Sequence, residues 1–319
     1  MNEQDVIRGL LYLFLTVLGI PGNLMVIAAF SHIAYFDRKL LPADIIVLHL
    51  MVVNLTLVVQ RCLFETLASF YVVNIFTDLG CKIVIYVYRT CRALSIWLTF
   101  VLSAFQCISI APTGSKWSSI KLHAPQYLVG VFVFIWILNT FLSAPSAIFS
   151  SSKDSNATSL NHSINIMFCF VKYPSELWKS SVGAVQIARD VVPMTLMLLA
   201  NIFILVILYR HSKHAKQIRS AKQNQKESAE MRAAKTVVTL VTLYILFFGI
   251  DNILWVYTLS ISETLATSII SDLRIFFASL YAAVSPIVII LSNRKVNNKL
   301  KCVAVDQAPQ SCETVKTTV

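Results

Sequence analysis

Two arginines lie inside an apolar segment of this chain that is long enough to cross a bilayer. The segment covers residues 81 to 112 and contains Arg89 and Arg92. In a helix that begins at Cys81, a rise of about 1.5 Å per residue places them roughly 12 and 16 Å deep, so Arg92 comes near the middle of a hydrocarbon layer about 30 Å thick. An arginine there costs from about 3 to more than about 10 kcal/mol unless it faces protein, water or an opposite charge. Because the two residues are three apart, they share a helical face, which we expect to point into a polar cavity.

The chemistry open to this face is the binding of an anion. A guanidinium group can bind a carboxylate through two parallel hydrogen bonds. That carboxylate can belong to a ligand or to the protein itself. Two interpretations therefore stay open: at least one arginine contacts a ligand directly, or both pair with acids elsewhere in the bundle and only hold it together.

Other charged residues also fall in apolar segments. Arg61 and Glu65 are four residues apart, and we expect them to pair with each other at least in part. Asp251 is predicted to be the one acid well inside the outer half of the bundle. Its candidate partners are Arg89, Arg92 and Arg274. Arginines outnumber acids among these residues, which favours an anionic or phenolic ligand, such as an aromatic acid or an acidic steroid, over an amine. The predicted ligand-binding set is Arg61, Arg89, Arg92, Asp251 and Arg274.

The composition requires a membrane to bury the apolar residues. Hydrophobic residues make up 56% of the 319 residues and charged residues only 13%, whereas soluble domains have about 25% charge. The first apolar run is long enough to span a bilayer, so we interpret it as a signal anchor and not as a cleavable signal peptide. The sequence predicts an all-α membrane protein, a seven-transmembrane helix bundle. The predicted spans cover about residues 6–30, 43–70, 81–111, 125–149, 182–209, 233–257 and 267–291.

The distribution of charge sets the orientation. Most of the 27 lysines and arginines fall in loops on one side, which the positive-inside rule makes cytoplasmic. The N-terminus is then outside, residues 1–301 form the seven-transmembrane domain and residues 302–319 form a cytoplasmic tail. The net charge of +11 thus orients the chain and can contact anionic membrane lipid, and it does not indicate nucleic acid.

The second outer loop, about residues 150 to 180, carries two kinds of extracellular signal. Asn156 and Asn161 each begin a glycosylation triplet. Cys169 lies in the same loop, and Cys81 lies at the outer end of the third span, where a disulfide persists. A bond between these cysteines would hold the loop over the third helix.

The spacing of reactive residues excludes most catalytic classes. The seven cysteines show no paired metal spacing, the six histidines are scattered, and we find neither clustered carboxylates nor a phosphate-binding loop. We therefore expect no enzyme activity, no metal and no cofactor. In the tail, Cys302 is a candidate palmitoylation site, and residues 317–319 can pair with the sheet edge of a PDZ domain.

Several features resemble the rhodopsin-like G protein-coupled receptors. They are the seven spans, the outside N-terminus, the cysteine of the third span with its partner in the second outer loop, and a set of single residues. The single residues are Gly22, Asn23, Trp136, Pro193 and Pro286. The likeness covers about residues 9 to 301.

The departures from that general pattern are more specific. The chain has Asn54 where the family usually has a sodium-binding aspartate, and Phe105-Gln106-Cys107 where the third helix usually ends in Asp-Arg-Tyr. Residues 247–251 replace the usual Cys-Trp-x-Pro motif, and Ser285-Pro286 replaces Asn-Pro. Together with residues 48–54 and 102–112, these substitutions resemble the vomeronasal type-1 receptors, and among them the olfactory receptor class A related group of fishes.

The resemblance implies a chemosensory receptor that detects small odorants or pheromones at an extracellular-side pocket. It also implies a heterotrimeric G protein of the inhibitory type as partner, in the plasma membrane of chemosensory neurons. Gln106, Lys213 and Lys235 are the residues expected to support G protein coupling. Two alternatives stay open: a type-2 taste-like receptor and a small-solute transporter, although the chain shows no internal repeat of the kind many transporters have.

Overall fold

Seven long apolar helices form the body of the molecule. The computed structural model describes residues 3–37, 40–70, 77–110, 117–152, 163–166, 169–215, 224–260, 265–293 and 296–297. Within these ranges, seven helices are long and apolar enough to span a membrane: Val6–Phe36, Pro42–Ser69, Asp78–Ile110, Pro125–Ile148, Glu176–Arg210, Ala234–Tyr257 and Asp272–Ser292. The predicted seven-helix membrane bundle is therefore confirmed.

The helices follow one another along the chain, with the two longest-separated ones, α5 and α6, joined through three short strands. Their bounds are α1 Glu3–His32, α2 Pro42–Val58, α3 Phe64–Ser69, α4 Asp78–Ile110, α5 Trp117–Ile148, α6 Glu176–Ala215, α7 Asn224–Ser260 and α8 Leu265–Ser292. Two π-helical turns, η1 Ile33–Asp37 and η2 Val59–Leu63, extend α1 and join α2 to α3. Beyond their apolar spans, α6 continues to Ala215 and α7 begins as early as Asn224.

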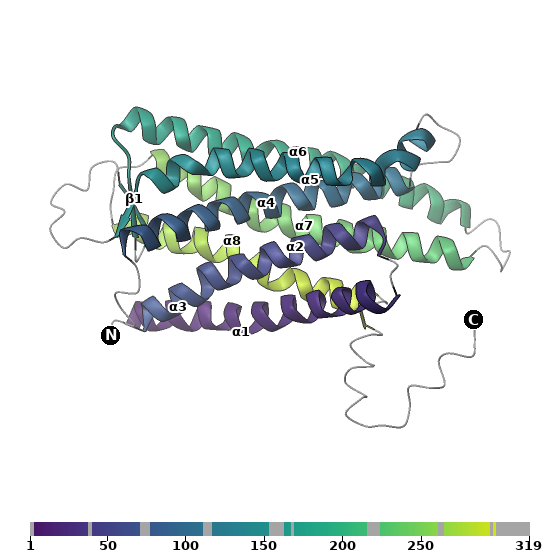
Figure 1. Cartoon of the computed structure of the whole chain (residues 1–319), viewed down its shortest axis with the longest axis horizontal. Helices are drawn as coiled ribbons and strands as arrows, with labels where there is room; N and C mark the ends of the chain where they lie inside the picture. The colour runs from purple at the N-terminus through teal and green to yellow at the C-terminus, as the bar shows by residue number, and fades with distance from the viewer. Residues whose placement is uncertain are drawn as a thin grey trace, which may run out of the picture.

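Figure 1 shows the long helices lying side by side along the long axis of the molecule. The start of α1 and the strand β1 lie at the same end of this bundle. We call it the outer end, because the charge distribution places the N-terminus outside.

A small antiparallel sheet lies at the outer end, within the predicted second outer loop. Its strands are β1 Ser150–Ser152, β2 Ser163–Ile166 and β3 Cys169–Lys172, in the order β1-β3-β2. The middle strand is bonded to the bundle, because Cys169 of β3 forms a disulfide with Cys81 of α4.

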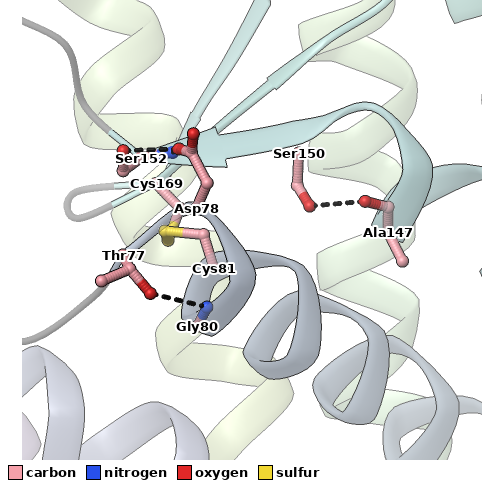
Figure 2. Close-up of a disulfide and its surroundings, with 8 residues drawn as sticks. All are labelled: Thr77, Asp78, Gly80, Cys81, Ala147, Ser150, Ser152 and Cys169. Atoms are coloured by element: carbon pink, nitrogen blue, oxygen red, sulfur yellow. Dashed lines mark hydrogen bonds between the residues drawn. A yellow bond between two sulfur atoms is a disulfide. The ribbon is translucent and has the colours of Figure 1, made fainter.

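A second connection joins the sheet to α4 without a covalent bond (Figure 2). Both the backbone amide and the hydroxyl of Ser152 donate to Oδ1 of Asp78, at 2.7 and 2.6 Å. The first turn of α4 therefore holds β1 through Asp78 and β3 through Cys81. The sheet is fixed over the helix that carries Arg89 and Arg92.

Small residues let α1 approach its neighbours closely. A Cβ built on Gly19 would lie 3.1 Å from Cα of Ala283 and 3.0 Å from a methyl carbon of Val58. One turn below, the Asn23 side-chain amide donates to the carbonyl of Ala282 at 3.0 Å. Asn23 thus bonds α1 to α8, and α1 packs tightly on α2 and α8.

The centre of the bundle is polar but uncharged. The Asn54 amide donates to Ser285 Oγ at 3.0 Å and accepts from Ser95 Oγ at 2.8 Å. All three side chains are buried. Asn54 thus links α2, α4 and α8 through neutral hydrogen bonds.

Some predicted sites lie outside the described residues. These are the glycosylation acceptors Asn156 and Asn161, Cys302 and the tail 302–319. Lys213 lies in the last turns of α6, where the side chains are likewise outside the described part of the chain.

Candidate functional site

Arg92 bridges two aspartates from two other helices. Its Nη1 donates to Asp190 Oδ2 of α6 at 2.7 Å, and its Nη2 bonds to Asp251 Oδ2 of α7. The Arg92 side chain is 13% exposed and each aspartate 2%. One guanidinium of α4 therefore ties together three helices at membrane depth, where each group needs an opposite charge.

Further arginines extend this bridge at both ends. Nε of Arg189 lies 3.2 Å from Asp190 Oδ1. Nε of Arg274 lies 3.3 Å from Asp251 Oδ1, without the alignment of a hydrogen bond. We call the series Arg189, Asp190, Arg92, Asp251 and Arg274 the ion-pair chain. It alternates in sign and runs from α6 through α4 and α7 to α8.

Arg89 belongs to the same region but has a neutral partner. Its Nη1 bonds to the side-chain carbonyl of Gln186 on α6. Gln186 is 4% exposed, and its own amide donates to Ser146 Oγ of α5 at 3.1 Å. Arg89 also lies close enough to Arg189 and Arg274 to interact electrostatically with both. The region thus contains four arginines and two aspartates.

Aromatic rings support the guanidinium groups from the side of α7. The Arg92 carbon Cζ lies 5.4 Å from the centre of the Phe248 ring, and Cζ of Arg274 lies 4.0 Å from that of Trp255. Phe248 in turn stacks on Tyr244 at 4.2 Å, and Tyr244 meets Tyr281 of α8 edge-on at 4.6 Å. A change at Arg92 can therefore reach the buried aromatic core between α7 and α8.

The predicted pairing of Arg61 with Glu65 is confirmed. Nη2 of Arg61 lies 3.0 Å from Glu65 Oε1, and the two side chains are 4% and 1% exposed. The Arg61 guanidinium also faces the ring of Tyr88 on α4 at 5.3 Å. Arg61 therefore takes its charge partner from its own helix, whereas Arg92 takes both partners from other helices.

The ion pairs correct one prediction and confirm another. Asp251 does pair with Arg92 and Arg274, two of its three candidate partners. It is not the one acid well inside the outer half, because Asp190 is 1% exposed and binds the same arginine. A depth count would have found Asp190: it lies eight residues after Val182, about 12 Å deep and level with Arg89.

The residues predicted for G protein coupling lie elsewhere. Gln106 is buried on α4, 7% exposed, and Lys235 is exposed on α7. Both are separated along their helices from Arg92 and Asp251 by about 14 and 16 residues, or roughly 21 to 24 Å. The structure thus has the charged region near one end and these two residues toward the other.

The comparison with known proteins identifies the chain's relatives. The model of the vomeronasal organ pheromone receptor family matches residues 7–302. This chain belongs to that family. It is therefore a chemosensory receptor of the G protein-coupled class and not an enzyme, as the sequence predicted. Membership also implies a small-molecule ligand and coupling to a G protein in general terms.

Individual relatives agree with the family match. The chain is 37% identical to the zebrafish olfactory receptor class A-like protein 1 over 312 residues, which cover 98% of this chain and 97% of that one. It is 30% identical to human vomeronasal type-1 receptor 2 over 63% of this chain and 51% of the relative. With vomeronasal type-1 receptor 1 of the gorilla the identity is 25%, over 93% and 83% of the two chains.

Proposed function

We propose that this receptor detects a small anionic ligand, such as an aromatic acid or an acidic steroid, at the arginines of the outer half of the bundle. The observation that carries the proposal is the excess of arginine. Among the described residues of this buried region, four arginines face two acids: Arg89, Arg92, Arg189 and Arg274 against Asp190 and Asp251. A buried positive excess is costly in a membrane and is compensated when an anion binds.

A ligand carboxylate activates the receptor by competing with Asp251 for Arg92. In the structure, Asp251 ties α7 to both Arg92 of α4 and Arg274 of α8. A ligand that occupies these guanidinium groups weakens both ties to α7. It shifts the population of states only because it binds the loosened state more tightly than the tied one.

The G protein then binds at the cytoplasmic end. Gln106, Lys213 and Lys235 are the residues we assign to this contact, with an inhibitory-type heterotrimer as partner in the plasma membrane of chemosensory neurons. Membrane lipid and a PDZ-domain protein at the C-terminus are further proposed partners. Membership in the vomeronasal pheromone receptor family favours this function over the taste-like and transporter alternatives. A counterflow assay on the protein in proteoliposomes would detect transport of a small solute.

A panel of matched ligands tests the charge of the agonist. Cells expressing the receptor are exposed to aromatic and steroid acids, their methyl esters and the corresponding amines, and G protein activation is recorded. We expect the acids to activate at concentrations at least tenfold lower than the esters or amines. Equal potency of the amines or the esters would contradict an anionic ligand.

The variant Arg274→Gln tests the location of the site. Asp251 keeps Arg92 as partner, so this change leaves neither aspartate without an arginine, whereas Arg92→Ala would remove the arginine that both aspartates share. Loss of a charge-assisted bond worth about 1.5 to 3 kcal/mol should raise the half-maximal concentration of the acid about tenfold or more. Lys82→Gln, at an exposed position of α4, removes the same charge away from the site and serves as control. An unchanged response of Arg274→Gln at normal surface expression would place the site elsewhere.

A further inference from the structure

Arg89 and Arg92 share a helical face but have opposite environments. Arg92 is bonded to two carboxylates, which together carry more negative charge than its single positive charge. Arg89 is bonded to the uncharged amide of Gln186. Within the described residues, no acid lies within ion-pair distance of Arg89. Its charge is therefore satisfied by a hydrogen bond but not neutralised.

The orientation of Gln186 is fixed from its other end. Its amide nitrogen donates to Ser146 Oγ at 3.1 Å, which leaves the amide oxygen for Arg89. Since Gln186 is 4% exposed, little water competes for either group. The relay from Ser146 of α5 through Gln186 of α6 to Arg89 of α4 holds the arginine in place and occupies only one of its five N–H donors.

A glutamate at this position would have nearly the same shape and the opposite consequence. It would place a carboxylate beside Arg89, the one arginine of the region that has no acid within ion-pair distance among the described residues. The choice of glutamine over glutamate is therefore what leaves a positive charge available. At Arg92, by contrast, an incoming anion must first displace an aspartate, which makes Arg92 the poorer first contact.

We propose that Gln186 is a specificity-determining positioning residue, which orients Arg89 without neutralising it and so makes Arg89 the primary anchor for the anionic group of the ligand. This inference rests on the proposed function and adds to it the residue that sets the charge preference. It also separates two roles within one helical face: Arg89 captures the anion, and Arg92 transmits its arrival to α7 through Asp251.

The test compares a carboxylic acid agonist with its methyl ester in G protein activation by the full-length receptor. In the wild type we expect the acid to be at least tenfold more potent. In Gln186→Glu the half-maximal concentration of the acid should rise at least tenfold while that of the ester stays within twofold, so that the preference for the acid disappears. Arg89→Gln should abolish the same preference.

A second substitution keeps the proposal testable if Gln186→Glu does not reach the cell surface. Gln186→Met keeps the length of the side chain and removes the acceptor, so Arg89 stays charged but loses its orientation. The acid should then weaken severalfold and the ester should not. Ser146→Ala should weaken the acid in the same sense and by less, because it releases only the far end of the relay.

The outcomes separate this inference from the proposed function. If the wild type does not prefer the acid, both the proposal of an anionic ligand and the proposed role of Gln186 are contradicted. Suppose instead that the wild type prefers the acid and that Gln186→Glu keeps this preference at normal surface expression. Only the proposed role of Gln186 is then contradicted. Gln186→Met decides the same question if Gln186→Glu does not reach the cell surface. A loss of acid and ester responses in equal proportion would show a merely structural role and would also overturn it.

Discussion

At the scale of single residues, removing the charge of Asp251 should activate the receptor as a bound ligand does. Asp251→Asn removes the charge that holds α7 to Arg92 and Arg274. We expect basal G protein activation to rise severalfold over the wild type. Asp190→Asn is the matched comparison, since it frees the same Arg92 from α6 but leaves α7 attached, and it should raise basal activity less. Unchanged basal activity of a normally expressed Asp251→Asn receptor would remove the proposed mechanism.

The pair of Arg61 and Glu65 should behave as a structural pair. Breaking a buried ion pair from one side costs about 3 to 5 kcal/mol, because the remaining charge is left without a partner. Arg61→Leu should therefore lower the melting temperature of the purified receptor, and the double variant Arg61→Leu with Glu65→Gln should recover most of that loss. If the double variant recovers stability but not the response to acid, Arg61 contributes to ligand binding as well.

The positions of the charged residues in the membrane were easier to predict from the sequence than their partners were. The depth of Arg89 and Arg92 and the i, i+4 pairing of Arg61 follow from helical geometry alone, and Asp251 was matched to the right class of partner. Asp190 was missed because it was interpreted only as a residue near the outer end of the fifth predicted span. In the structure Asp190 is shared between Arg189 and Arg92, which lies on another helix. Such sharing depends on tertiary contacts that spacing cannot give.

At the scale of the helices, the close approach of α1 should make Gly19 intolerant of any side chain. A Cβ there would lie 3.1 Å from the backbone of Ala283, which cannot move as a flexible side chain can. Gly130→Ala offers an identical change in α5, where nothing lies within 4 Å of the added carbon. We expect Gly19→Ala to reduce thermal stability and surface expression, and Gly130→Ala to leave both unchanged or slightly improved because alanine favours helix. Equal behaviour of the two variants would contradict the tight packing of α1.

The helices were predictable and the sheet was not. A chain in lipid must satisfy its backbone within each span, so an apolar run of sufficient length becomes a helix whatever its neighbours do. The outer loop has no such constraint. Its strands are three to four residues long, too short for an alternating pattern, and they pair Ser150 with Val171 far apart in the sequence. Only the cysteine of β3 gave a signal, because its partner at the start of α4 was recognisable.

At the scale of the whole molecule, the sheet and the ion-pair chain both contact α4, the sheet at its first turn and the ion-pair chain further along at Arg92. The disulfide closes a separation of 88 residues, which in the chain-entropy model stabilises by about 4 to 5 kcal/mol. The hydrogen bonds from Ser152 to Asp78 form a second, weaker attachment at the same turn of α4. The sheet should therefore stay near α4 when the disulfide alone is removed, and it should detach when both attachments are lost.

This arrangement predicts a graded effect on the response to ligand. The paired variant Cys81→Ser with Cys169→Ser should lower the melting temperature and weaken the response to acid, while Asp78→Asn alone should change either quantity only slightly, because the covalent bond remains. The triple variant should lose more than the two effects added together, since neither attachment then limits the position of β1 and β3. Strict additivity at equal surface expression would mean that the two contacts do not hold one common element over the arginines.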